Sequence, residues 1–159
     1  MAASLSTRLP LRVGRGMITG MIDPPFEHIA SRRADSQLLF VCDHAASALP
    51  EAYGNLGLAP ELFATHIASD IGAAMVTRTL AAEFGAAAIL ARWSRLLIDL
   101  NRGADDPTLV MKLSDRSIIP GNALADWREV LLRLERFHAP SPDTLAPDIL
   151  TTPGCCARP

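Results

Sequence analysis

The chain has 159 residues, enough for one domain of ordinary size and too few for two. Hydrophobic residues make up 49% of the sequence and charged residues 20%, so a sizeable core can form and global disorder is excluded. A formal charge of -2 and an aromatic content of 5% argue against a nucleic-acid-binding protein, which needs a cationic surface and stacking side chains.

The cysteines and the hydropathy pattern indicate the cellular compartment in which we expect the protein. Cys42, Cys155 and Cys156 form no disulfide framework, and the sequence has no convincing secretory signal, so we expect a reducing, cytoplasmic environment. No stretch approaches the roughly 18 uninterrupted apolar residues of a membrane helix, so we expect no membrane partner. The sequence makes no prediction about the oligomeric state.

Composition divides the chain into three parts. Residues 1–34 carry arginines without a long apolar run and are predicted to be a leader, either disordered or translated from an upstream start codon. Residues 35–138 have regular hydrophobic patterns and are predicted to form one α/β domain. Residues 139–159 are rich in proline, which blocks helices, so an irregular tail is predicted there.

The hydrophobic patterns predict alternating strands and helices. The apolar runs at 38–42, 87–91 and 96–100 are typical of buried strands. The spacing of apolar residues predicts a long helix over 58–86 and a second helix over 124–137. Strands that alternate with helices indicate an α/β fold.

The second predicted helix has an apolar side, which we expect to face the core. The residues on that side are Trp127, Val130, Leu131, Leu134 and Phe137. The charged residues of this helix, Arg133 among them, are expected to lie mostly elsewhere.

Asp43 and His44 directly follow the first predicted strand. Ligand sites in open α/β sheets gather at the carboxyl ends of strands, so His44 is a candidate metal ligand or general base. The alternative is a structural turn in which Asp43 caps a following helix.

His66 and Asp70 are four residues apart in the first predicted helix and would therefore share one face. They could form a functional pair in which the carboxylate fixes one tautomer of the imidazole. They could equally be a hydrogen-bonded pair on the exposed side of the helix.

Charged residues interrupt the third predicted strand. Arg95, Asp99 and Arg102 flank or break its apolar run, and a buried charge is costly unless it is paired or faces a cavity. Arginine recognises carboxylates through two parallel hydrogen bonds, so these residues indicate a small anionic substrate. An internal arginine–aspartate pair is the alternative.

Four segments, taken in order, resemble the N-formylglutamate amidohydrolase family. They read LLFVCDHAASALPEAYGNLGL, HIASDIGAAMVTRTLA, ARWSRLLIDLNRGADDPTL and SDRSIIPGN, and they run from residue 38 to residue 122. The resemblance implies a zinc-carboxypeptidase-like (phosphorylase/hydrolase-like) sheet with flanking helices. It also implies a hydrolase that acts on the amide bond of an N-acyl acidic amino acid. The parent reaction converts N-formyl-L-glutamate and water to formate and L-glutamate in histidine degradation.

The resemblance also implies roles for residues within these segments. His44 would bind a catalytic Zn²⁺ ion, while Asp43, His66 and Asp70 would support it or handle protons. The small-molecule substrate would be held by a further set of residues: Arg95, Asp99, Asn101, Arg102 and Asn122.

Two departures from the family pattern stand out. Ala45-Ala46-Ser47 stands where the family usually has Ala-Ser-Asn, so polar groups are lost or shortened beside His44. Members of the family also continue past this chain into a part that looks like a second source of metal ligands. We therefore expect a C-terminally truncated domain, in which either the hydrolase site persists or a non-catalytic binding module retains an arginine-lined carboxylate pocket.

Overall fold

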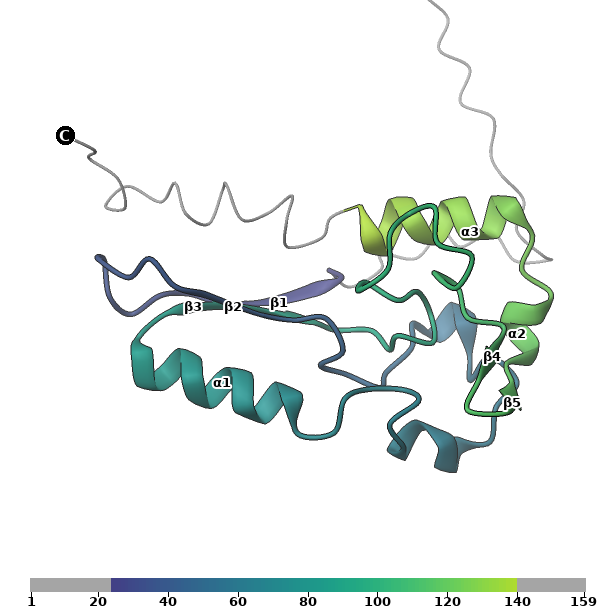
Figure 1. Cartoon of the computed structure of the whole chain (residues 1–159), viewed down its shortest axis with the longest axis horizontal. Coiled ribbons are helices and arrows are strands. Elements are labelled where there is room, and N and C mark those ends of the chain that lie inside the picture. Colours follow the sequence, from purple (N-terminus) through teal and green to yellow (C-terminus); the bar gives the residue numbers. More distant parts are fainter. Residues whose placement is uncertain (1–23, 140–159) are drawn as a thin grey trace, which may run out of the picture.

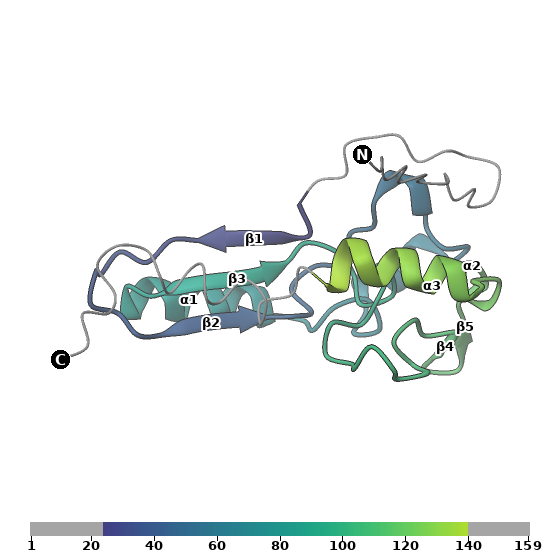
Figure 2. The same ribbon diagram turned by 90° about the horizontal axis from the view of Figure 1, so that it is seen from above.

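The computed structural model describes residues 24–139, in which a small mixed sheet packs against one helix (Figure 1). Within these residues three strands share one sheet in the order β1-β3-β2 (Figure 2). Strand β1 (Phe26–Ile29) runs antiparallel to β3 (Ala87–Ala91), and β2 (Leu39–Cys42) runs parallel to β3. This arrangement of sheet and helices confirms the α/β class.

Small side chains let helix α1 (Ala73–Phe84) lie close against the sheet (Figure 1). Ala81 of the helix packs with Cys42, Ala88 and Leu90 in one buried cluster. The helix ends at Gly85, whose φ of 60° is the left-handed conformation that glycine adopts without strain. The sheet and α1 therefore form one compact layer pair at one end of the described chain.

Short elements and loops form the other end of the described chain (Figure 1). They comprise the 3-10 helices η1 (Glu51–Tyr53) and η2 (Pro60–Ala64), the hairpin of β4 (Leu113–Ser114) and β5 (Ser117–Ile118), helices α2 (Pro120–Ala123) and α3 (Trp127–Arg133), and a π-helical turn η3 (Leu134–His138). Two apolar clusters, one around Leu96 and Ile119 and the other around Leu97 and Phe137, hold this end together.

The predicted strands are partly confirmed. The run at 87–91 is β3 as expected, and the run at 38–42 is β2 without its first residue. The run at 96–100 is not a strand, since residues 95–97 form a turn in the interior. Side chains satisfy its backbone in place of a neighbouring strand: Asn122 Nδ2 donates to the Leu96 carbonyl at 2.7 Å, and Arg133 Nη1 donates to the Leu97 carbonyl at 2.9 Å.

The long helix predicted over 58–86 is wrong in its first half. Residues 60–64 form only η2, and α1 begins at Ala73 after Gly72, whose φ is 85°. Between them the backbone N–H of Asp70 donates to the carbonyl of His44 at 3.0 Å, which draws this segment to the end of β2 instead of into a helix. His66 and Asp70 therefore do not share a helix face.

The core face predicted for the second helix is wrong at Trp127 and Leu131, which are exposed, and right at Phe137, which is buried. Helix α3 begins at Trp127, because the Asp126 side chain accepts hydrogen bonds from the first free backbone N–H groups. Trp127 is 69% exposed, whereas Arg133 is 2% exposed and Glu129 is buried beside it. The two charges form an ion pair of 2.7 Å, Arg133 Nε to Glu129 Oε1, which offsets the cost of their burial.

The boundaries predicted for the domain differ from the structure at its N-terminal side. Strand β1 lies within residues 1–34, the predicted leader, and pairs with β3 along its whole length. Residues 1–23 of that leader, and the predicted tail from residue 140 onwards, lie outside the described residues. None of the helices in the described range is long and apolar enough to cross a bilayer.

Replacing Asn122 by alanine should destabilise the protein by about 2–4 kcal/mol, because two carbonyls and the Arg133 guanidinium lose a buried partner. Urea unfolding followed by circular dichroism measures this. Asn101→Ala, at an exposed position, is the matched control and should cost less than about 0.5 kcal/mol. Equal effects of the two substitutions would contradict a supporting role for Asn122.

Candidate functional site

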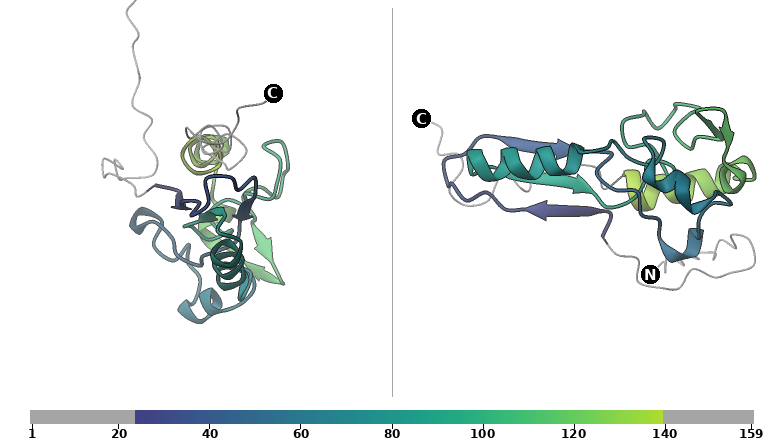
Figure 3. Two further views of the ribbon diagram at one scale, coloured as in Figure 1. Left: turned by 90° about the vertical axis from the view of Figure 1, so that its left-hand side faces the viewer. Right: turned by 90° about the horizontal axis from the view of Figure 1, so that it is seen from below.

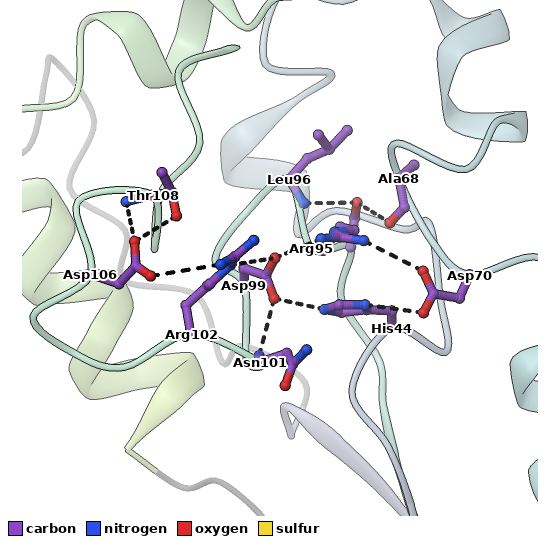
Figure 4. A network of polar contacts seen from close by, with 11 residues as sticks. His44, Ala68, Asp70, Arg95, Leu96, Asp99, Asn101, Arg102, Asp106 and Thr108 are labelled. Atoms are coloured by element: carbon purple, nitrogen blue, oxygen red, sulfur yellow. Dashed lines mark hydrogen bonds and ion pairs between the residues drawn. The ribbon is translucent and has the colours of Figure 1, made fainter. Parts of the chain in front are cut away.

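The residues that follow β2 form the centre of the site. His44 is almost fully buried, and its ring lies between two carboxylates from separate segments of the chain (Figure 4). Its Nε2 is 2.7 Å from Asp99 Oδ1, and its Nδ1 is 3.3 Å from Asp70 Oδ2. The prediction that Asp43-His44 lies at the carboxyl end of a strand is confirmed.

Asp99 is fully buried and is compensated by donors on several sides. Besides His44, the backbone N–H of Asn101 donates to it at 3.0 Å, and Arg95 Nη2 donates at 2.9 Å. Burial alone would raise the pKa of Asp99, but these partners together hold its pKa below the usual value. Asp99 is therefore ionised at neutral pH, and its carboxylate fixes the His44 ring.

The hydrogen bond from Asp99 changes the proton affinity of His44. It raises the pKa of the His44 imidazole above its ordinary value, although burial and the nearby Arg95 act in the opposite direction. A carboxylate on Nε2 also fixes the tautomer, with the proton on Nε2 and the lone pair on Nδ1 when the ring is neutral.

The two candidate arginines differ in how firmly they are held (Figure 4). Arg95 bridges Asp99 at 2.9 Å and Asp70 at 3.5 Å, so it forms the internal arginine–aspartate pair that the sequence left as an alternative. Arg102 lies 3.9 Å from Asp99 and 3.8 Å from Asp106, and its side chain is 45% exposed. Arg102 is thus the more available of the two for an anionic ligand.

A cavity of about 530 Å³ opens beside the His44 ring. Its polar lining consists of Asp43, His44, Asp70 and Asn101. The rest of its lining comes from the end of β2 and the start of α1 and is mainly apolar: Val41, Cys42, Ile71, Gly72, Ala73, Val76 and Thr77. A volume of this size accommodates a small organic substrate with room to spare.

The structure brings most of the predicted site residues together and leaves two apart. Asp43, His44, Asp70 and Asn101 line the cavity, Asp99 contacts the His44 ring, and the two arginines in turn lie beside Asp99. His66 instead lies at the surface, 3.8 Å from Asp115. Asn122 is fully buried among backbone carbonyls and Arg133, away from the cavity lining.

Sequence reasoning did not single out the support that Arg133 gives this site. Arg133 donates to Asn122 Oδ1 at 2.7 Å and to the carbonyl of Leu97, in the turn that leads to Asp99. The available signal was the spacing of Glu129 and Arg133, since residues four apart on a helix can pair. That spacing does not say whether the pair is buried or exposed.

The donor set fits a metal ion only in part. Within residues 24–139 no group of three or more histidine, cysteine or acidic side chains is placed to hold one. His44 Nδ1 and Asp70 Oδ2, however, face each other at 3.3 Å, and two ligands of a tetrahedral zinc ion lie about 3.3 Å apart. Asp99 on the other ring nitrogen is the usual partner of a zinc-binding histidine. His44 and Asp70 thus have a spacing that suits two zinc ligands, one fewer than the three of a typical catalytic site.

Comparison with known proteins adds two findings. The model of the N-formylglutamate amidohydrolase family matches residues 36–151. Among solved structures, the chain is similar to the gene product Atu2144 from Agrobacterium tumefaciens, with 31% sequence identity and a TM-score of 0.73. The match covers 80% of this chain and 50% of that one, so this chain spans about half the length of that protein. A search of curated proteins gives no match.

In the metal-free protein His44 should titrate above its ordinary pKa of about 6.5, and Asp99→Asn should lower its pKa. Because the pKa of His44 is higher in the folded than in the unfolded protein, protonation of His44 stabilises the fold. This stabilisation is complete at a pH below the pKa of His44 in the unfolded chain, and it is lost as the pH rises through the pKa of His44 in the folded protein. NMR titration of the ring protons measures the pKa, and urea unfolding across the same pH range measures the stability. Asp115→Asn is the control, and an equal shift of the His44 pKa in that variant would contradict the assignment.

Proposed function

Since this chain belongs to the N-formylglutamate amidohydrolase family, which the match over residues 36–151 shows, we propose that it takes part in metal-dependent hydrolysis of an N-acyl acidic amino acid. The reaction would convert N-formyl-L-glutamate and water to formate and L-glutamate. The observation that carries the proposal is the His44 ring, fixed by Asp99 on one nitrogen and facing Asp70 and the cavity with the other. The zinc-carboxypeptidase-like arrangement of the sheet stays a prediction of the resemblance.

His44 and Asp70 are the residues of this chain that would hold the metal ion. Their facing atoms, Nδ1 and Oδ2, are the pair whose separation suits zinc, and further ligands would come from outside residues 24–139. When bound, the ion would supply a Lewis acid that polarises the amide carbonyl and activates water.

The other residues of the site have roles that follow from their contacts. Asp99 accepts a hydrogen bond from the Nε2–H group of His44, which keeps the Nδ1 lone pair directed towards Asp70. Arg95 joins Asp99 to Asp70 and offsets their negative charge, so it positions both carboxylates. Asp43 lines the cavity beside His44 and is the candidate to accept a proton from the attacking water.

Arg102 and Asn101 would bind the substrate. Arg102 lies beside the site with an exposed guanidinium that its two acidic neighbours hold only at long distance. A substrate carboxylate could therefore bind it without first breaking a short ion pair. Asn101 lines the cavity, where its side-chain amide could orient the amide of the substrate.

Zinc should bind to the purified chain through His44 and Asp70. Titration against a chelating dye should show binding lost in His44→Ala and Asp70→Asn, and weakened about 10–100-fold in Asp99→Asn. Asp115→Asn should bind zinc like the unchanged chain, and formate release from N-formyl-L-glutamate should need zinc. Metal-independent binding of N-formyl-L-glutamate, with no zinc affinity at His44, would contradict the hydrolase and support the non-catalytic binding module.

Arg102→Ala should raise KM for N-formyl-L-glutamate about tenfold or more, because a charged hydrogen bond to a carboxylate is lost. With N-formyl-L-glutamine, which lacks the side-chain carboxylate, the same substitution should change KM less. Steady-state kinetics measures KM for both compounds. If turnover is slow, dissociation constants measured by calorimetry take the place of KM. Equal changes in KM for the two compounds would show that Arg102 does not bind the side-chain carboxylate of the substrate.

A further inference from the structure

The centre of the site is assembled from three separate segments of the chain. We call them the first, second and third segments: residues 44–48, 68–70 and 94–99. They carry His44, Asp70 and Asp99 in that order, and none of these three residues belongs to a strand or a helix. Strands β2 and β3 end, and α1 begins, at the end of the sheet nearest the short elements, where the segments follow or precede them (Figure 3). Bonds between the segments therefore decide how the three side chains lie relative to one another.

Ser94 bonds all three segments at once. It is fully buried, and its backbone N–H donates to the carbonyl of Ala48, in the first segment, at 2.7 Å. Its hydroxyl donates to the carbonyl of Ala68, in the second segment, at 2.7 Å (Figure 4). The same hydroxyl accepts from the N–H of Leu96, in the third segment, at 3.2 Å. One residue thus connects every part of the chain that supplies the site.

The hydroxyl of Ser94 acts as donor and acceptor together. Ala68 and Leu96 are themselves fully buried, so the carbonyl of the one and the N–H of the other are shielded from water. Both groups would lose a partner in the interior if the hydroxyl were removed. Alanine is close to serine in volume, so Ser94→Ala removes these two bonds and leaves the packing almost unchanged.

The side chain of Asp70 depends on its backbone for its position. It is 54% exposed, and its contacts are long: 3.3 Å from Oδ2 to His44 Nδ1, and 3.5 Å from Oδ1 to Arg95 Nη1. The backbone around it is held at two points, by its own N–H on the His44 carbonyl at 3.0 Å and by the bond from Ser94 to Ala68. The second point joins the segment to the residue next to Arg95. Loss of that point would let the Asp70 carboxylate move relative to both of its neighbours.

We propose that Ser94 is a positioning residue, whose hydroxyl holds the Asp70 carboxylate at its place beside the His44 ring. It thereby sets the separation of the two side chains that would hold the metal ion. The part of the proposal that concerns the metal ion rests on the proposed function. The part that concerns the position of Asp70 rests only on the contacts of Ser94.

Zinc affinity, measured by titration against a chelating dye, is the first test. Ser94→Ala should bind zinc about 10–100-fold more weakly than the unchanged chain, because groups that orient metal ligands have effects of this size. Ser94→Thr keeps the hydroxyl and should bind zinc within about threefold of the unchanged chain. Equal weakening in the two variants would overturn the proposal, because the hydroxyl would then not be the cause.

Ser31→Ala is the matched control. The Ser31 hydroxyl also donates to the carbonyl of a distant residue, Gly85, at 2.8 Å, and accepts from the N–H two residues later, that of Arg33, at 3.2 Å. It follows the carboxyl end of β1, which is the opposite end of the sheet from His44. The substitution should change the zinc affinity less than about twofold, because it is remote from the site. Weakening equal to that of Ser94→Ala would overturn the proposal.

Amide hydrogen exchange tests the positioning without zinc and without substrate. In the unchanged chain the N–H of Leu96 should exchange slowly, since a buried hydroxyl accepts it. In Ser94→Ala the N–H groups of Leu96 and Asp70 should exchange faster, while those of β3 keep their rates. A general loss of stability would instead speed exchange in β3 as well, and that result would overturn the proposal.

The outcomes separate this proposal from the proposed function. If the unchanged chain binds no zinc, the proposed function fails, and the exchange rate of the Asp70 N–H decides whether Ser94 positions Asp70. Circular dichroism shows whether the variants are folded. If Ser94→Ala is not folded, the zinc affinity of Ser94→Thr and the exchange of Leu96 in the unchanged chain decide, and fast exchange there would overturn the proposal.

Discussion

The buried carboxylate of Asp99 is the constraint from which the site is built. A fully buried anion is stable only where donors converge on it, and here they come from His44, the Asn101 backbone and Arg95. These bonds join the end of β2 to a turn more than fifty residues later in the chain. The position of the His44 ring, and hence the direction of its Nδ1 atom towards Asp70, follows from that one compensated charge.

A second buried charge supports the first. No strand within residues 24–139 pairs with the turn before Asp99, and its carbonyls accept hydrogen bonds from Asn122 of α2 and Arg133 of α3. Glu129 compensates Arg133 in turn, and the aromatic ring of Tyr53 lies 4.7 Å from the guanidinium. The geometry at His44 is therefore maintained by helices that do not touch the cavity.

The sequence predicted local features well and long-range contacts poorly. The β3 run and the place of His44 after β2 were predictable, because an apolar run followed by polar residues is a local signal. The run at 96–100 has the same signal but is buried by side chains from distant helices, which a single sequence does not reveal. The pairing of His44 with Asp70 depends on a break in the predicted helix before α1. The helical spacing of the sequence predicted no break there.

The dependence of the Leu96–Leu97 turn on Asn122 and Arg133 also has a consequence for the order of folding. These hydrogen bonds span 26 and 36 residues, so the turn that carries Asp99 is satisfied only after the chain as far as Arg133 has been synthesised. On the ribosome, the β2–β3–α1 unit can form while His44 still lacks its fixed partner. The sheet can therefore form early in synthesis, whereas the site is completed late.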